Sequence, residues 1–190
     1  MTTLALDRYD RHFPFFDGTV PLPPGLDLQV LQVGQENRWR DGDHRHSRML
    51  NKGAFDAAET SLSSYVVAKG KGLPFTAIPV FPRRLFSQGQ IYVNADAGIR
   101  TPADLAGRTV GLQSFQTTLA VLAKGDLAAD HGVPLDSIKW RLHHADTLAT
   151  KNSRGFDIQT LPDGTDLGTA LAEGRIDALF YSRTPQAKGG

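Results

Sequence analysis

The sequence predicts an α/β protein with mainly parallel sheets flanked by helices, built as two similar lobes. The phrase Leu-x-x-Gly-x-(Phe or Ile)-Asp-Ala occurs at residues 50–57 and again at residues 171–178. In both copies a helical approach meets a glycine where a helix would end, and an apolar residue and Asp-Ala then open a buried strand. Strand-like and helical runs also alternate along the chain, which is typical of parallel sheets. Two similar lobes predict a ligand cleft between them, whereas chance or a common helix-to-strand turn is the alternative.

The first part of the chain alternates between short strands and helices. Residues 21–25, Pro-Leu-Pro-Pro-Gly, form a turn that fits neither a helix interior nor a central strand. Apolar alternation predicts strands at residues 4–6, 26–33, 55–59, 76–81 and 91–93, and helices at residues 47–52 and 65–68.

The second part carries the clearest local signals. Thr101-Pro102-Ala103-Asp104 is a capping box with proline at the first helical position, and Gly107 ends that short helix. We predict strands at residues 108–112, 138–142 and 176–181, helices at residues 119–131 and 167–173, and a flexible polar loop at residues 149–166. The boundary between lobes is expected within residues 83–90. The predicted organisation is therefore lobe 1 at residues 1–88, lobe 2 at residues 89–183 and a disordered tail at residues 184–190.

Composition excludes several classes of function. The 190 residues are 40% hydrophobic and 22% charged, with a formal net charge of +1, so nucleic acid is not an expected partner. The absence of cysteine excludes disulfides, thiolate metal sites and a cysteine nucleophile. No apolar run reaches membrane-spanning length, and Asp7, Arg8 and Asp10 interrupt the N-terminal region. We therefore expect no membrane partner and a cytoplasmic chain, unless an upstream segment has been removed.

Residues 101–111 resemble the segment that opens the second lobe of the type II periplasmic-binding-protein fold, an x-Asp-Leu-x-Gly-(Lys or Arg)-x-Val-Gly pattern. Residues 174–178 fit the same lobe, and residues 53–57 fit the first. A narrower resemblance, to 4,5-dihydroxyphthalate decarboxylases and related solute-binding proteins, rests on residues 55–65, 77–86 and 91–99.

This resemblance implies a two-lobed fold and a decarboxylase of an aromatic dicarboxylate that uses no organic cofactor. Residues 141–146 depart from the stretch rich in glycine and glutamate that the family usually shows there. The family also continues well past the last residue of this chain, so the resemblance implies an incomplete first lobe.

Two polar loops before predicted helices are the candidate carboxylate-binding segments. A helix N-terminus offers free N–H groups and the positive end of the helix dipole, and hydroxyls add further donors. Simple N-capping is the alternative for both loops. The candidate residues are Thr60, Ser61, Ser63 and Ser64 in the first loop, and Gln113, Ser114, Gln116, Thr117 and Thr118 in the second.

Five further residues are candidates for catalysis or binding. Protonation of an aromatic ring carbon requires an acid, and Glu59, at the end of a predicted strand, or His44 could supply the proton. An outward-facing, solvated carboxylate is the alternative for Glu59. Arg83 or Arg84 could pair with a substrate carboxylate, the other being solvated. Tyr92 could donate a phenolic hydrogen bond or belong to the core.

The histidine clusters do not predict a metal site. His143 and His144 are adjacent and would point to opposite faces of a strand, and His44 and His46 supply only two rings, so neither cluster presents a good local set of ligands. We expect no metal and no cofactor, and a small aromatic carboxylate as the partner. A receptor for an organic acid and an inactive truncated fragment are the alternatives to a decarboxylase. A homo-oligomer is a further way to complete the first lobe.

Overall fold

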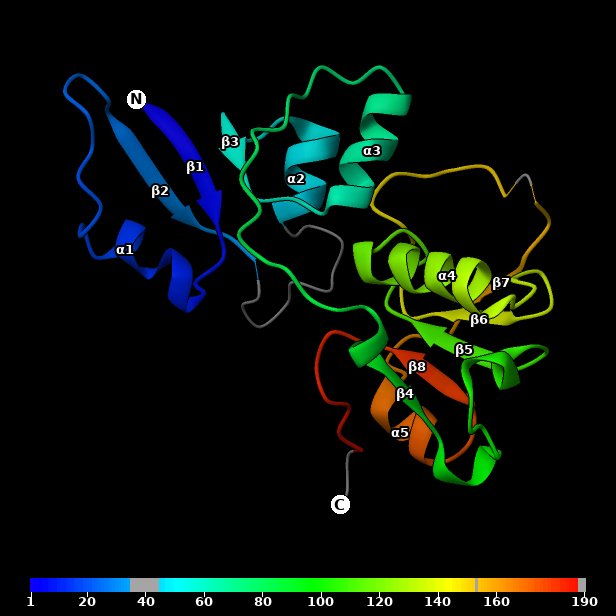
Figure 1. Ribbon diagram of the computed structural model, residues 1–190. Helices are drawn as coiled ribbons and strands as arrows, with labels where there is room; N and C mark the ends of the chain where they lie inside the picture. The colour runs from blue at the N-terminus through cyan, green and yellow to red at the C-terminus, as the bar shows by residue number, and fades with distance from the viewer. Residues whose placement is uncertain (35–44, 153, 188–190) are drawn as a thin grey trace. The chain divides into compact units, whose positions relative to one another are not determined.

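The computed structural model describes residues 1–34, 45–152 and 154–187 (Figure 1). The chain divides into two compact units, Met1–Arg83 and Arg84–Gly190, called here the first and the second unit. Both are α/β in character, and most of their strand pairs are parallel.

The first unit contains a three-stranded parallel sheet in the order β2-β1-β3. Ala5 and Leu6 of the central strand are buried, and so are Leu50, Phe55 and Ala68. The strands are β1 (Thr2–Leu6), β2 (Leu28–Gln32) and β3 (Ala57–Ala58), and the helices are a 3-10 turn (Asp10–His12), α1 (Phe13–Phe16), α2 (Arg45–Lys52) and α3 (Leu62–Gly70).

The second unit contains a five-stranded sheet in the order β4-β8-β5-β6-β7, in which only the β4–β8 pair is antiparallel. Its strands are β4 (Ile91–Val93), β5 (Thr109–Leu112), β6 (Lys139–Leu142), β7 (Asp157–Thr160) and β8 (Ala178–Phe180). Its helices are α4 (Thr118–His131) and α5 (Leu167–Ala172), with 3-10 turns at Gln88–Gln90, Ala95–Ala97 and Pro102–Leu105.

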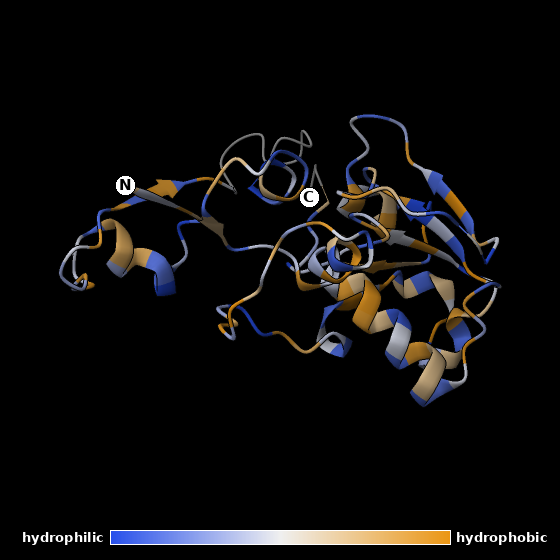
Figure 2. Ribbon diagram, turned by 90° about the horizontal axis from the view of Figure 1, so that it is seen from above, coloured by the Kyte–Doolittle hydropathy of each residue, from blue (hydrophilic) through white to orange (hydrophobic). Residues whose placement is uncertain are grey.

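Apolar residues of the second unit form a core on each face of this sheet. Trp140, Phe180 and Leu112 pack with buried residues of α4 on one face. Leu179 and Ile176 pack with residues of α5 on the other. In Figure 2 the long helix α4 carries both apolar and polar residues, as expected for a helix with one buried side.

The repeated phrase forms the same local structure in both units. Gly53 follows α2 with φ of 57°, and Gly174 lies just beyond α5 with φ of 69°, a conformation that glycine adopts at little cost. Asp56 then accepts a hydrogen bond from the backbone N–H of Thr3 at 2.8 Å, and Asp177 accepts one from that of Thr109, also at 2.8 Å.

Each of these aspartates thus ties the start of one strand to the start of its parallel neighbour. β3 pairs with β1 in the first unit, and β8 pairs with β5 in the second. The interpretation of the phrase as a repeated helix-to-strand connection is confirmed.

Two element predictions are wrong, and one predicted strand is shorter than expected. No strand forms at residues 76–81, where Pro79 removes a backbone donor and Ile78 and Val80 are exposed. The strand predicted at residues 55–59 shrinks to β3. The loop predicted at residues 149–166 contains β7, because β6 offers a pairing edge and Ile158 packs on the core.

The predicted tail is divided between described and undescribed residues. Residues 184–187 lie against α5, since a side chain at Gly168 would meet the backbone of Gln186. Residues 188–190 lie outside the described residues. In the part of the chain that the structure describes, no helix is both long enough and apolar enough to cross a membrane.

Candidate functional site

The parallel strands of the first unit place polar residues at the carboxyl edge of its sheet, the edge at which α/β proteins commonly bind ligands. Asp7 follows β1 and Glu59 follows β3. Between them lies Arg45, the first residue of α2, whose side chain is only 5% exposed. Its guanidinium donates to the Glu59 carboxylate at 2.9 Å and lies 3.9 Å from that of Asp7. These three residues form what we call the Arg45 cluster.

Aromatic and basic residues adjoin the Arg45 cluster. The Tyr9 ring lies 4.2 Å from the guanidinium carbon of Arg11 and 6.0 Å from that of Arg83. Burial raises the pKa of Tyr9, and the carboxylates of Asp7 and Glu59 raise it further, against the opposing charges of Arg83 and Arg45. The Tyr9 phenol therefore stays protonated near neutral pH and can donate a hydrogen bond.

The first hydroxyl-rich loop lies just beyond Glu59 and leads into α3. Ser61 is the residue before the helix, and its hydroxyl oxygen lies 3.1 Å from that of Ser63. Ser64 is buried within the first turn, whereas Thr60 and Ser61 are half-buried. The loop therefore brings hydroxyl groups and helix N–H groups to the sheet edge that carries the Arg45 cluster.

In the second unit, the loop at residues 113–117 lies between β5 and α4, at the corresponding sheet edge. The Thr117 hydroxyl accepts a hydrogen bond from the N–H of Ala120 at 3.3 Å and so caps α4. Gln116 is buried, and its side-chain amide makes two hydrogen bonds with the backbone of Leu148, of 2.9 and 3.2 Å. The amide of Gln116 thus braces this loop.

One peptide group of the second loop is held from both ends. The carbonyl oxygen of Phe115 accepts a hydrogen bond from the Lys124 ammonium at 2.8 Å, and the N–H of Gln116 donates to Asp146 at 2.8 Å. The same ammonium nitrogen lies 3.0 Å from the centroid of the Phe115 ring. These two bonds fix the backbone just before α4, and the bond from Lys124 is strengthened when its amine is protonated.

Burial lowers the pKa of Lys124 to about 7, although the charge of Asp146 acts in the opposite direction. The ordinary pKa of a lysine, 10.5, applies to the unfolded chain. Between these values the unfolded chain holds a proton that the folded chain has released, so the free energy of unfolding rises with pH. Below about pH 7 both states hold the proton and this contribution levels off.

We therefore expect the second unit to gain about 2 kcal/mol of stability between pH 7 and pH 9 through Lys124. Lys124→Met should remove that gain, which urea unfolding at several pH values would measure. Lys139→Met, at an exposed lysine, is the matched control and should keep the wild-type slope. Equal slopes in wild type and Lys124→Met would contradict the prediction.

The remaining candidates are spread over both units. Tyr92 lies in β4 and packs against the core beside α5. Ser114 is buried, and Thr118 is the first residue of α4. Arg83 and Arg84, both exposed, stand on either side of the division between the units. His44 lies outside the described residues.

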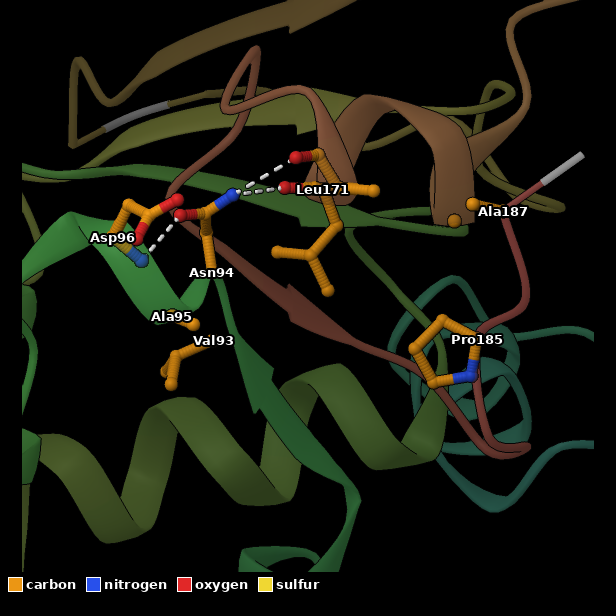
Figure 3. A pocket seen from close by; sticks show the side chains of 9 residues that line it. Val93, Asn94, Ala95, Asp96, Leu171, Pro185 and Ala187 are labelled. Atoms are coloured by element: carbon orange, nitrogen blue, oxygen red, sulfur yellow. Dashed lines mark hydrogen bonds between the residues drawn. The ribbon is translucent and has the colours of Figure 1, made fainter. Parts of the chain in front are cut away.

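A hollow of about 260 Å³ lies at the other end of the second unit's sheet (Figure 3). Asn94 lines it, donating to the carbonyl oxygens of Leu171 and Ala172 at 2.6 and 3.3 Å and accepting from the N–H of Asp96 at 2.8 Å. These bonds cap the end of α5, so Asn94 serves the fold there. In residues 1–34, 45–152 and 154–187, no group of three or more His, Cys, Asp or Glu residues is placed to hold a metal ion.

Sequence reasoning missed Asp7, Arg45, Lys124 and Asp146. Asp7 could have been found, because it directly follows a predicted strand at the edge where Glu59 was placed. Arg45 and Lys124 carried no local signal, since the groups that they contact belong to other segments of the chain.

The parallel strands and their flanking helices in both units are consistent with a periplasmic-binding-protein-like fold. Residues 25–160 match the family described as "NMT1/THI5 like", and the chain belongs to that family. It is 33% identical to a 4,5-dihydroxyphthalate decarboxylase of Comamonas testosteroni and 30% identical to one of Pseudomonas putida, in each case over 96% of this chain. The chain spans 55% of the Comamonas protein and 70% of the Pseudomonas protein.

Proposed function

We propose that this chain removes one carboxylate from a dihydroxylated aromatic dicarboxylate such as 4,5-dihydroxyphthalate, releasing carbon dioxide and 3,4-dihydroxybenzoate. The carrying observation is the identity of 33% and 30% with two decarboxylases of that name, over nearly the whole chain. The polar sheet edge of the first unit supports the proposal, because it brings carboxylate, phenol, hydroxyl and guanidinium groups near one another.

The reaction exchanges a carbon–carbon bond for a carbon–hydrogen bond. A hydroxyl group para to the departing carboxylate supplies electron density to the ring carbon that bears it, and that carbon takes up a proton. The electron pair of the carbon–carbon bond then returns to the ring as carbon dioxide leaves. The site must therefore hold the dicarboxylate and deliver one proton.

In this proposal the two hydroxyl-rich loops hold the substrate carboxylates through Ser61, Ser63, Ser64 and Thr117, with an arginine, Arg83 or Arg84, as a further partner. Glu59 takes a proton from solvent and passes it to the ring carbon, and His44 is the alternative donor. The ligand cleft between lobes that the sequence predicts stays a prediction.

Glu59→Gln is expected to lower kcat for 4,5-dihydroxyphthalate about a hundredfold, because a positioned acid contributes at least that much to proton transfer. Loss of substrate and appearance of 3,4-dihydroxybenzoate would be followed by chromatography with the purified chain. The matched control is Glu173→Gln, since Glu173 is an exposed carboxylate paired with an arginine, 2.7 Å from Arg175. Unchanged turnover in Glu59→Gln would remove Glu59 from the proposed role.

The same assay distinguishes a decarboxylase from the two alternatives, a receptor and an inactive fragment. The NMT1/THI5-like family also includes substrate-binding proteins, so a folded chain that binds 4,5-dihydroxyphthalate without turnover would be a receptor. A folded chain that does neither would be an inactive fragment. The cytoplasmic location is likewise a prediction, which fractionation of cells that make the tagged chain would test.

A further inference from the structure

Arg45, at the start of α2, contacts three separate segments of the first unit. Its Nε donates to the backbone carbonyl oxygen of Glu59 at 2.7 Å, and a terminal nitrogen donates to the carboxylate of the same residue at 2.9 Å. Its other terminal nitrogen donates to the carbonyl oxygen of Val33 and lies 3.9 Å from the Asp7 carboxylate. One guanidinium therefore contacts the segments that follow β1, β2 and β3.

The location of this guanidinium leaves little room for movement. The side chains of Arg45, Asp7 and Glu59 are only 5%, 7% and 12% exposed. A Cβ atom on Gly34 would lie 2.5 Å from a terminal nitrogen of Arg45, so the backbone closes directly over the cluster. The Arg45 side chain is therefore packed closely against the backbone at Gly34.

The two bonds from Arg45 to Glu59 act on the orientation of that glutamate. One holds its main chain and the other holds its carboxylate, so the side chain between them loses much of its rotamer freedom. A free glutamate side chain loses conformational entropy when it is ordered, and a side chain that is already fixed has lost that entropy before substrate arrives. The guanidinium is planar and its donors form a rigid fork, so the two bonds to Glu59 act together on this orientation.

We propose that Arg45 is a positioning residue for Glu59, acting on the reaction only through the placement of the Glu59 carboxylate. This inference rests on the proposed function, in which Glu59 delivers the proton. Asp7 balances the charge of Arg45 from the opposite side and so keeps the guanidinium in place between the two carboxylates.

A double-mutant cycle on kcat tests this inference, with Arg45→Lys, Glu59→Gln and the combined variant. Lysine keeps the charge but lacks the planar fork, so Arg45→Lys should lower kcat about tenfold while KM changes less than twofold. In the Glu59→Gln background the same change should lower kcat less than twofold, because the carboxyl group that Arg45 positions is absent from that variant. Arg48→Lys, on the same helix, should leave both constants unchanged.

The alternative is a purely structural role, in which Arg45→Lys lowers kcat by the same factor in both backgrounds; that result would overturn the inference. Unchanged kcat in Glu59→Gln alone would instead contradict the proposed role of Glu59.

If wild type binds 4,5-dihydroxyphthalate but does not turn it over, the decarboxylase proposal fails and the double-mutant cycle is measured on Kd by calorimetry instead. Non-additive changes in Kd would then support the positioning role and additive changes would overturn it. A folded wild type without turnover or binding would contradict both proposals.

Discussion

Arg45→Met should unfold the first unit or leave it barely stable, with a loss of about 3–5 kcal/mol. The substitution keeps an unbranched apolar stem of similar reach and removes the charge between the buried carboxylate of Asp7, 7% exposed, and the half-buried carboxylate of Glu59, 12% exposed. It also removes the donors to the carbonyl oxygens of Val33 and Glu59. Buried acceptors and charges without partners account for the size of the loss.

Hydrogen exchange read by mass spectrometry would test this prediction, because it reports on each unit separately. Exchange in Arg45→Met should speed up in peptides of residues 1–83, and peptides of residues 105–142 should keep their protection. The control is Arg48→Met on the same helix, where the guanidinium carbon lies 4.7 Å from the Phe55 ring centroid and the expected loss is only about 0.5–1 kcal/mol. Equal losses in the two variants would show that the buried charges are not the cause.

The charge explanation has its own test. If the unpaired carboxylates cause the instability, adding Asp7→Asn and Glu59→Gln to Arg45→Met should recover part of the loss, because neutral amides are less costly to bury than charges. If lost packing were the cause, the added substitutions would leave the unit as unstable as Arg45→Met alone.

Elements with strong local signals could be predicted from the sequence. The capping box at Thr101 and Asp104 forms as expected, and α4 ends at Gly132, whose φ is 62°. The repeated phrase gave the correct connection in both units because its glycine acts directly at the end of its own helix. Local chemistry decides such features, so a single sequence suffices.

Elements that depend on distant partners could not be predicted in this way. The apolar run at residues 76–81 has the alternation of a strand, yet it needs a neighbouring strand, and Pro79 disfavours that pairing. β7 has a weak pattern of its own and exists because β6 offers four residues to pair with it in register. Apolar periodicity shows that a segment could form a strand, and the presence of a neighbouring strand to pair with decides whether the strand forms.

The candidate site also combines residues that local sequence signals reveal with residues that depend on distant partners. Glu59 and the hydroxyl-rich loops follow strands and precede helices, so their positions could be inferred from the order of elements. Arg45 reaches back to residues 7 and 33 and forward to residue 59. Its role depends on the order in which β2, β1 and β3 pair in the sheet, which no local pattern in this chain encodes.

Trp140→Ala should destabilise the second unit by about 3–5 kcal/mol, the cost of removing the largest fully buried side chain of its core. The indole ring packs edge-on against Phe115 and Phe180, with centroid distances of 5.8 and 6.1 Å. Its N–H donates to the carbonyl oxygen of Leu135 at 3.1 Å. A cavity between the sheet and α4 would result, and the lost dispersion contacts could be only partly regained.

Urea unfolding followed by circular dichroism would measure this loss, with Trp140→Phe as the graded control. Phenylalanine keeps an aromatic ring in the core and loses only the N–H and part of the volume, so a loss of about 1–2 kcal/mol is expected. A smaller loss for Trp140→Ala than for Trp140→Phe would contradict the cavity explanation.

The cavity has a second consequence, since the Lys124 ammonium lies 5.7 Å from the Trp140 ring centroid. Water that enters the space left by Trp140→Ala would solvate that ammonium and weaken the burial that lowers its pKa. The gain of stability between pH 7 and pH 9 should therefore shrink in Trp140→Ala and persist in Trp140→Phe. A full gain in Trp140→Ala would show that the cavity stays dry and that the burial of Lys124 does not depend on this ring.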